Sequence, residues 1–452
     1  MDVTSIRTPG LGDATYVVAH EGLGIVIDPQ RDVARFERAL ADADVELRYV
    51  LETHMHNDYV SGGRGLAERH AAEIVLPAGS GAAFDFTPAF HTEDLEAGRG
   101  LRIRPLHTPG HTPEHVSYLV LVDGEPVAVF SGGSLLVGSS GRPDLLSAPQ
   151  AEPLARLQYV SVNRLAALPD EVGLYPTHGE GSFCTASGAG RTVSTIGDEK
   201  RTNPVLAQPD IEAFVKHTLA ELQPWPAYYA HMGPANVFAP TALDDADLTA
   251  PALATADVAA RAGDVAVVDA RPRERFAAGH VPGALGIELS EQFGVWAGWV
   301  LPFNAPVQLV LDRDQDATEA IVQLGRIGFD AIEGILWDFA AWEPAGHAVE
   351  RFRRVSIADV VAAFDAGEQP QLLDVRAPGE VEAEPLPGAI HGYVPDLVDG
   401  VPAELDAARP VWVVCGSGFR SAIAASLLAR QGFEPVIVDG GGASEINQAH
   451  AA

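Results

Sequence analysis

Cysteine, lysine and methionine are scarce in this chain of 452 residues. It contains two cysteines, Cys184 and Cys415, three methionines, and lysine only at Lys200 and Lys216. Because the two cysteines fall in separate predicted domains, they do not suggest a disulfide framework. Free thiols persist in a reducing compartment, so we expect a cytoplasmic protein.

Positive charge is scarce relative to negative charge, and long apolar runs are missing. The 30 basic residues against 62 acidic ones give a formal net charge of −32. Such a field repels nucleic acid and anionic lipid surfaces, so we expect neither as a partner. No apolar run reaches the roughly 18 to 20 residues of a membrane helix, and the first residues lack the pattern of a signal peptide.

The length predicts about three domains at roughly 150 residues each. A content of 47% hydrophobic and 20% charged residues is ordinary for globular domains. We place the domains at residues 1–240, 253–346 and 353–452, with an acidic, proline-flanked linker at 240–251. The first domain would end in an extended bracing tail from residue 224 onward.

Histidines gather at the ends of predicted strands in the first domain. A strand at residues 47–51 is followed by His54, His56 and Asp58, and a Pro-Gly turn precedes His111. His178 follows another short apolar strand. Imidazole and carboxylate groups at neighbouring loops are typical metal ligands.

These motifs resemble the metallo-β-lactamase superfamily over roughly residues 1–205, which implies a four-layer αββα sandwich. In that family the His-x-His-x-Asp-His motif ends in a histidine, but this chain has Tyr59 there. A strand ending in Phe-Thr-Gly-Asp normally supplies a ligating and, in two-metal members, bridging carboxylate, which is here replaced by Gly133. Both losses fall on the second metal position, which disfavours two-metal hydrolysis.

The first metal position keeps His54, His56 and His111. Asp58 and His178 would either support these ligands through hydrogen bonds or serve as alternative ligands. Residues 52–63, 141–144, 178–184 and 194–204 resemble the persulfide dioxygenases and their rhodanese fusions. That resemblance implies mononuclear Fe(II) held by two histidines and a carboxylate, at His54, His111 and the position of Gly133. Three outcomes stay open: His56 or Asp58 replaces the missing ligand, the site is weak or empty, or it is a zinc hydrolase site.

A second motif lies near the C-terminus. The apolar strand at 411–414 leads into Cys415 and a glycine-rich loop, with Arg420 just before the helix at 422–429. Loop amides and a helix N-terminus that point at the sulfur favour the thiolate. The loop resembles the active-site loop of rhodanese, in which the cysteine carries a persulfide sulfur. The loop residues are Gly416, Ser417, Gly418, Phe419 and Ser421.

Buried structural roles remain alternatives for both cysteines. Cys184 is either a sulfur relay that faces the metal cleft or a packed small residue.

The rhodanese-like sequence occurs twice. Residues 307–329 align without gaps to residues 411–433, at an offset of 433 − 329 = 104. Leu311 then occupies the position of Cys415, and Asp316 that of Arg420, so the first copy is catalytically dead. His280 there would serve packing or a turn. The predicted fold is therefore an α/β chain, a metallo-β-lactamase αββα sandwich followed by two rhodanese-like doubly wound α/β domains.

We interpret the chain as an enzyme of sulfane-sulfur metabolism. It would oxidise a low-molecular-weight thiol persulfide, such as that of glutathione, to sulfite and transfer sulfur through Cys415 and Arg420. A pure sulfurtransferase that uses thiosulfate or a persulfide, with a metal-poor first domain, is the main alternative. A non-enzymatic sulfur-sensing or scaffold protein is the other. A homodimer is compatible with each.

Overall fold

The computed structural model describes residues 1–184, 191–238 and 241–451, which form two compact units. The first unit comprises Met1–Leu248 and Val322–Gly328, and the second comprises Thr249–Ile321 and Phe329–Ala452. Pro240, where the sequence places the start of the linker, lies outside the described residues. No helix among the described residues is both long and apolar enough to cross a membrane.

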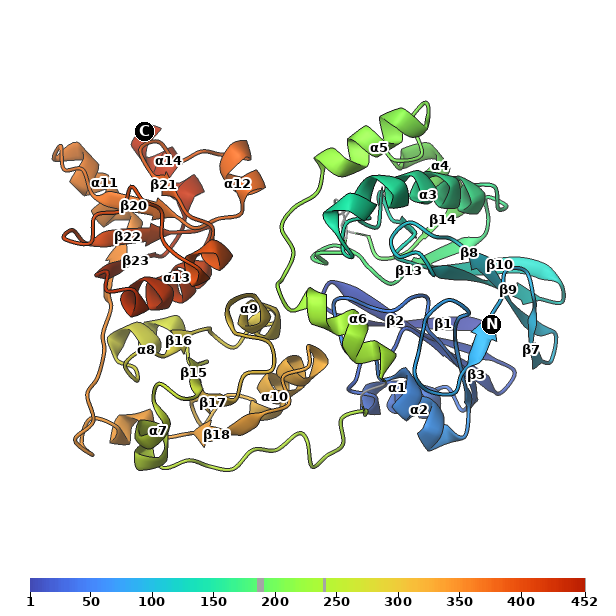
Figure 1. Cartoon of the computed structure of the whole chain (residues 1–452), viewed down its shortest axis with the longest axis horizontal. Coiled ribbons are helices and arrows are strands. Elements are labelled where there is room, and N and C mark those ends of the chain that lie inside the picture. Colours follow the sequence, from blue (N-terminus) through green and yellow to red (C-terminus); the bar gives the residue numbers. More distant parts are fainter. Residues whose placement is uncertain (185–190, 239–240, 452) are drawn as a thin grey trace. The chain divides into compact units, whose positions relative to one another are not determined.

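The first unit contains two sheets of six strands each (Figure 1). The first sheet has the strand order β1-β2-β3-β4-β5-β6: β1 (Asp2–Thr8), β2 (Asp13–His20), β3 (Leu23–Ile27), β4 (Glu46–Leu51), β5 (Glu73–Pro77) and β6 (Thr87–Ala89). The second has the order β14-β13-β10-β9-β8-β7: β7 (Leu95–Gly98), β8 (Leu101–His107), β9 (Val116–Val122), β10 (Glu125–Gly132), β13 (Gly173–Pro176) and β14 (Ser194–Thr195). A small hairpin, β11 (Leu135–Leu136) and β12 (Ser139–Ser140), follows β10.

Helices cover the outer face of each sheet. The helices are α1 (Ala34–Asp42), α2 (Gly63–His70), α3 (Ala148–Ala166), α4 (Ile196–Thr202), α5 (Ile211–Ala220) and α6 (Tyr229–Val237). Strand residues alternate between two cores, as the period of a strand requires: Tyr16 and Val18 face the other sheet, whereas Val17 packs with Phe36 of α1. On the second sheet, Leu119 and Leu121 pack outward with residues of α3 and α5. The predicted αββα sandwich is confirmed.

The end of this unit differs from the sequence-based expectation. We expected an extended tail from residue 224, but Tyr229–Val237 form α6. The helix has Gly233 and Pro234 in its interior, which disfavour helix by pattern alone. It packs on the loop that carries His56, as described below.

The second unit contains two all-parallel sheets with matching strand orders. The first is β16 (Leu285–Gly286), β15 (Ala266–Asp269), β17 (Val307–Val310) and β18 (Ile332–Leu336). The second is β21 (Ile390–His391), β20 (Gln371–Asp374), β22 (Val411–Val414), β23 (Pro435–Asp439) and β19 (Arg353–Ser356). The order of the first four strands is the same in both, and the doubly wound topology is as predicted.

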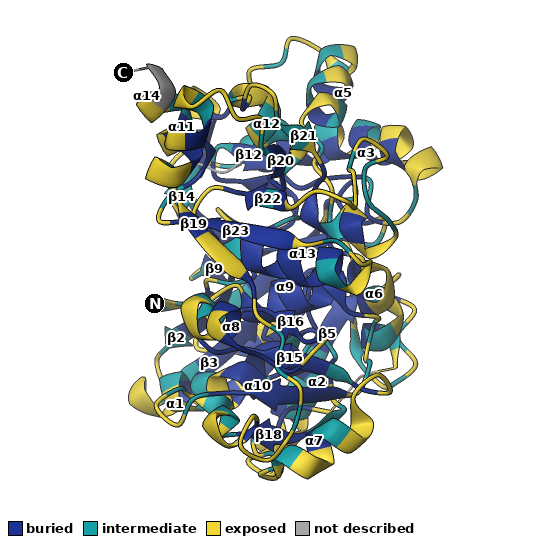
Figure 2. Ribbon diagram, turned by 90° about the vertical axis from the view of Figure 1, so that its left-hand side faces the viewer, coloured by how far each residue is buried: buried dark blue, intermediate teal, exposed yellow. Residues whose placement is uncertain are grey.

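Helices flank both of these sheets, and their buried faces meet the strands (Figure 2). They are α7 (Thr255–Arg261), α8 (Arg273–Ala278), α9 (Phe293–Val300), α10 (Ala317–Arg326), α11 (Ile357–Asp365), α12 (Pro378–Ala383), α13 (Phe419–Arg430) and α14 (Ala443–Ala451), with short 3₁₀ turns at Phe339–Ala341 and Val394–Val398. One core joins residues of both repeats, including Phe276 and Val310 from the first and Ala425 and Ile437 from the second. The two predicted domains therefore form one compact unit.

Candidate functional site

Three histidines from three loops of the first unit meet at one point. His54 follows β4, His111 lies between β8 and β9, and His178 follows β13. Their nearest donor atoms all lie within 4.8 Å of one another, and His54 Nε2 is 3.4 Å from His178 Nε2. All three side chains are buried, at no more than 1% exposure. Such a cluster is a candidate metal centre.

The Nδ1 atom of each imidazole has a polar partner. The partners are Thr53 Oγ1 at 2.9 Å from His54, the backbone oxygen of Arg142 at 2.8 Å from His111, and Asp13 Oδ1 at 2.8 Å from His178. These contacts leave Nε2 of each ring for a ligand. His111 Nε2 is buried without a hydrogen-bond partner among the described residues. A metal ion bound to this nitrogen would give it a partner.

The protonation of the cluster also suits a metal. Burial, with the neighbouring His178, lowers the pKa of His111 to about 3, and burial with the other imidazoles lowers the pKa of His54 well below its usual value. Both rings are therefore neutral and able to ligate at pH 7. Burial alone would lower the pKa of His178, but Asp58 and Asp13 raise it to about 9. A metal on Nε2 would replace the extra proton.

Two carboxylates accompany His178. Asp58 Oδ2 lies 3.2 Å from His178 Nδ1, the same nitrogen that faces Asp13. Burial opposes ionisation of Asp58, but the His178 charge keeps the pKa of Asp58 well below its usual range. Burial and the nearby Asp58 raise the pKa of Asp13 to about 8. A bound cation would favour the ionised form of both carboxylates.

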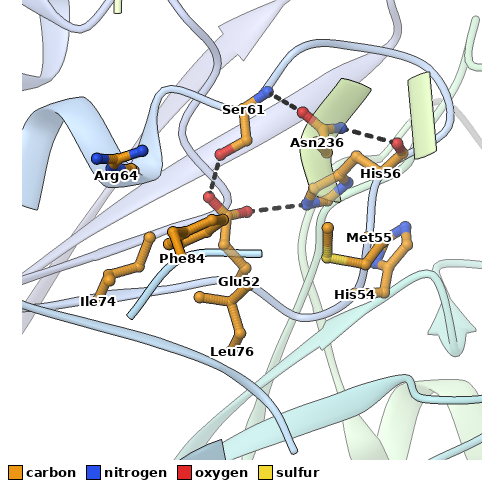
Figure 3. A pocket seen from close by; sticks show the side chains of 10 residues that line it. All are labelled: Glu52, His54, Met55, His56, Ser61, Arg64, Ile74, Leu76, Phe84 and Asn236. Carbon is orange, nitrogen blue, oxygen red and sulfur yellow. Dashed lines mark hydrogen bonds and ion pairs between the residues drawn. The ribbon is translucent and has the colours of Figure 1, made fainter. Parts of the chain in front are cut away.

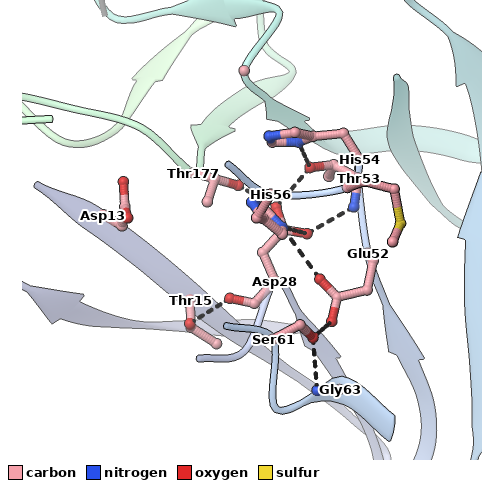
Figure 4. A network of polar contacts seen from close by, with 12 residues as sticks. Asp13, Thr15, Asp28, Glu52, Thr53, His54, His56, Ser61, Gly63 and Thr177 are labelled. Carbon is pink, nitrogen blue, oxygen red and sulfur yellow. Dashed lines mark hydrogen bonds and ion pairs between the residues drawn. The ribbon is translucent and has the colours of Figure 1, made fainter. Parts of the chain in front are cut away.

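His56, which the sequence assigned to the first metal position, has two buried carboxylates beside it (Figure 4). Its Nε2 lies 3.2 Å from both Asp28 Oδ1 and Glu52 Oε2, and 3.0 Å from the hydroxyl of Tyr59. Burial alone would lower the pKa of His56, but Asp28 and Glu52 raise it well above its usual value. The two carboxylates thus favour the protonated form of His56. The group of donor atoms that contains His54 and His111 has His178 as its third member, and His56 forms a second group with Asp58 and His178.

This assignment predicts a structural role for His56. His56→Ala would leave the carboxylates of Asp28 and Glu52 buried and facing one another, so we expect a loss of about 3–5 kcal/mol in the free energy of unfolding. Urea unfolding followed by circular dichroism measures it, with the exposed His107→Ala as control. Unchanged stability together with loss of bound metal would instead make His56 a ligand.

The structure leaves little space for a side chain at Gly133, where the family has its carboxylate. A Cβ atom on Gly133 would lie 2.2 Å from His111 Cδ2 and 2.7 Å from His111 Cγ. The backbone N–H of Gly133 donates a hydrogen bond of 2.9 Å to His115 Nε2, and His115 Nδ1 faces Thr108 Oγ1 at 2.9 Å. Both nitrogens of His115 are thus occupied, so His115 supports the centre without ligating. The ring of His111 fills the space in which a side chain at position 133 would begin.

Helix α6 covers the loop between the two clusters. Asn236 donates to the backbone oxygens of His56 and Tyr59, each at 2.9 Å, and Tyr228 donates to the backbone oxygen of Asp58 at 3.1 Å. Beside this loop lies a cavity of about 20 Å³ lined in part by Glu52, His56 and Asn236 (Figure 3). That volume accommodates about one water molecule.

Cys184 is buried near this region. Burial raises the pKa of its thiol well above the usual value, and Asp58 and Asp13 add to the effect. A buried thiol that stays protonated is a poor nucleophile. These features favour the packed small residue over the sulfur relay.

Cys415 lies between β22 and α13 in the second unit. The backbone N–H of Gly418 points at Cys415 Sγ from 3.1 Å, and Gly418 has a φ of +88°, which favours glycine. Of the other loop residues, Gly416 and Ser417 are exposed, Phe419 is half-buried and Ser421 is buried. The loop thus presents the amide predicted from the sequence to a sulfur that is itself buried.

Arg420 has a partner that the sequence did not indicate. Its guanidinium forms an ion pair with Glu380 of α12, with Nη2 at 2.8 Å from Oε1. Burial opposes the charge of Arg420, but Glu380 and then Cys415 raise its pKa. Part of the arginine's charge is therefore balanced before any anionic substrate arrives.

The first repeat contains no thiol at the equivalent place. Leu311 follows β17, and Asp312 in the adjoining loop pairs with Arg275 at 2.6 Å. Arg273 of the same repeat lies 3.6 Å from Asp439, which flanks Gly418 of the active loop. His280 is buried, with its ring centroid 3.9 Å from that of Phe276, in agreement with a packing role.

The αββα unit with a buried histidine cluster, followed by a cysteine loop on a parallel sheet, defines an enzyme that combines a metallo-hydrolase fold with a rhodanese-like domain. The sequence profile of the metallo-beta-lactamase superfamily matches residues 7–178, and that of the rhodanese-like domain matches residues 356–449. The human mitochondrial persulfide dioxygenase ETHE1 is 30% identical over 197 residues, 42% of this chain and 69% of that protein. The chain belongs to the metallo-beta-lactamase superfamily.

Two further comparisons bear on the first unit. The hydroxyacylglutathione hydrolase of Aeromonas hydrophila is 32% identical over 179 residues, 38% of this chain and 64% of that enzyme, so the chain spans less than two thirds of its length. The structure of a metallo-beta-lactamase from Staphylococcus aureus subsp. aureus COL matches with a TM-score of 0.68 and 27% identity. The match covers 74% of this chain and 99% of the Staphylococcus aureus chain. Because the first unit contains a smaller share of this chain than that, the match extends beyond the first unit.

Proposed function

We propose that this chain is a persulfide dioxygenase-like sulfurtransferase, in which a metal centre and a persulfide-carrying cysteine serve sulfane-sulfur metabolism. A histidine cluster suited to a single ion and a rhodanese-type loop in the same chain carry the proposal. The substrate of the first unit would be a low-molecular-weight thiol persulfide, such as glutathione persulfide. Cys415 would accept sulfur from thiosulfate or from a persulfide.

Cys415 performs the transfer step as a thiolate. It attacks the outer sulfur of thiosulfate, the bond between the two sulfurs of thiosulfate breaks, and sulfite leaves with the electron pair. The product is a persulfide on Cys415, whose negative charge is stabilised by the N–H of Gly418 and by Arg420. A thiolate acceptor then attacks the outer sulfur and regenerates the Cys415 thiolate.

The oxidation in the first unit balances as one persulfide, one dioxygen and one water giving one thiol, one sulfite and two protons. His54, His111 and His178 would hold the ion, and their burial keeps bulk water from the centre. Iron(II), when bound, would supply a redox-active centre with open coordination positions, and zinc is the alternative ion. Asp58 and Asp13 would balance the cation's charge through their contacts with His178.

Thioester hydrolysis, suggested by the hydroxyacylglutathione hydrolases among the relatives, is the weaker candidate. Two-metal hydrolysis requires a ligand shared between two ions. At the places where the family supplies ligands for the second ion, this chain has Gly133 and Tyr59, and Tyr59 donates its hydroxyl to the backbone oxygen of Asp28 at 3.2 Å. One ion is therefore the better match to the donors present.

Elemental analysis and oxygen uptake test the proposal. Protein purified without oxygen is expected to hold about one iron per chain and to consume dioxygen with glutathione persulfide. His54→Ala and His111→Ala are expected to remove both properties while sulfur loading of Cys415 continues, because Cys415 lies in the other unit.

Each contrary result has a distinct meaning. No iron and no oxygen uptake, with sulfur transfer intact, would make the chain a pure sulfurtransferase with a metal-poor first unit. Bound zinc with hydrolysis of a hydroxyacylglutathione would make the first unit a hydrolase.

A further inference from the structure

We infer that His178, anchored at Nδ1 by Asp13, has taken the ligand place that Gly133 leaves vacant, so that the centre has three imidazoles and a supporting carboxylate. The inference rests on the metal centre of the proposed function and deepens it. In the family pattern His178 belongs to the second metal position. Here its Nε2 faces Nε2 of His54 at 3.4 Å, and the nearest donor atoms of His54, His111 and His178 form one group.

Backbone pairing holds Asp13 beside His178, although the two residues lie 165 positions apart in the sequence. Asp13 and His178 form an antiparallel bridge, with the N–H of Ala14 donating to Thr177 at 2.8 Å and the N–H of Gly179 donating to Gly12 at 2.9 Å. Both side chains are buried completely or nearly so. The 2.8 Å contact between Asp13 Oδ1 and His178 Nδ1 is therefore set by paired main chain.

A carboxylate on Nδ1 has two consequences for the other nitrogen. It holds the N–H on Nδ1, which leaves the lone pair on Nε2, and it makes Nε2 a stronger donor. Three neutral imidazoles provide no charge to offset a divalent cation in a buried site. With a cation bound, Asp13 together with Asp58, which lies 3.2 Å from the same nitrogen, would supply the negative charge that the carboxylate at position 133 no longer provides.

A second feature shows that a side chain at position 133 cannot supply the missing ligand while His111 keeps its present position. The ring of His111 lies where a side chain on Gly133 would begin, and its Nδ1 is held by the backbone oxygen of Arg142 at 2.8 Å. The family's carboxylate and this position of His111 are mutually exclusive. His178 reaches the centre from another loop and needs no such space.

Asp13→Asn tests the inference. Asparagine keeps the size and an oxygen that accepts from Nδ1, but it removes the charge. We expect cobalt(II) or iron(II) to bind about 10–100-fold more weakly, with a changed cobalt absorption spectrum. Glu199→Gln is the matched control, because Glu199 is an equally buried carboxylate of the same unit that contacts Gly138, Ser194 and Asn203 instead.

A purely structural ion pair would behave differently: Asp13→Asn would then lower the melting temperature but leave metal affinity and spectrum unchanged. That result would overturn the inference. X-ray absorption of the cobalt-loaded unaltered chain provides a second measurement if the variant does not fold. Three imidazole ligands are expected, and two would refute the proposal.

Failure of the inference is distinct from failure of the proposed function. The chain could bind cobalt through three imidazoles and respond to Asp13→Asn, yet consume no dioxygen with a persulfide. That outcome would support the three-imidazole centre and refute the dioxygenase activity. If the unaltered chain consumes dioxygen with a persulfide while the Asp13→Asn variant binds metal normally, the dioxygenase activity is supported and the role of Asp13 is refuted. A chain that binds no metal would refute both.

Discussion

Replacing Cys415 by serine is expected to abolish sulfur transfer, with a loss on the order of 10³-fold or more. The hydroxyl of serine is far less ionised than a thiol at neutral pH, and an oxygen cannot carry a transferable sulfane sulfur. After incubation with thiosulfate, intact-mass spectrometry should detect one added sulfur atom on the unaltered chain and none on the variant. The N–H of Gly418 would remain in place, so the loss reports on the sulfur itself.

The chain supplies its own control for this experiment. Cys184 is the only other cysteine, and it is buried with a raised pKa. Cys184→Ser is expected to keep both transfer and the added sulfur. If the sulfur were instead found on Cys184, or transfer survived in Cys415→Ser, the rhodanese-type assignment would be wrong.

Gly133→Asp is expected to destroy the metal centre, although it restores the residue that the superfamily has at this position. Its Cβ would lie 2.2 Å from His111 Cδ2, so the ring must swing away from the hydrogen bond to the backbone oxygen of Arg142. We expect metal binding to weaken at least about 100-fold, since one imidazole is displaced. Overpacking adds about 1–3 kcal/mol of destabilisation. Metal content after dialysis against a weak chelator measures the effect.

Alanine separates the steric effect from the charge. Gly133→Ala introduces only the clashing methyl group and should also lose metal. Gly79→Ala is the matched control, because its Cβ would have only an ordinary contact, 3.4 Å from Glu114 Cβ. If Gly133→Asp bound iron more tightly than the unaltered chain, a family-like centre with an aspartate ligand would be favoured and the three-imidazole centre rejected.

The cysteine loop was predictable because its parts are consecutive. Cys415, Gly418 and Arg420 lie within a few residues between a strand and a helix, so local geometry alone brings the amide to the sulfur. Glu380 was not predictable, because it reaches Arg420 from a separate helix. The sequence likewise indicated the repeat but not the core that both copies share.

The histidines were predictable as a set but not as a ligand group. Strand ends and a Pro-Gly turn identified His54, His56, His111 and His178, yet their spacing does not determine which way each ring points. His56 turns to two carboxylates, one of which, Asp28, follows a neighbouring strand. Asp13 lies 165 residues from its partner His178, so no local pattern could connect them.

The sequence by itself determined the αββα sandwich, the tandem repeat and the rhodanese-like cysteine loop, because strand periodicity and contiguous loop motifs depend on neighbouring residues. Only the tertiary structure decided that donor atoms of His178 lie with those of His54 and His111, that Asp13 contacts His178, and that α6 covers the loop. Those features depend on side-chain directions and on pairing between distant segments. The physical cause is the packing of two sheets, which brings loops far apart in the chain to one buried point.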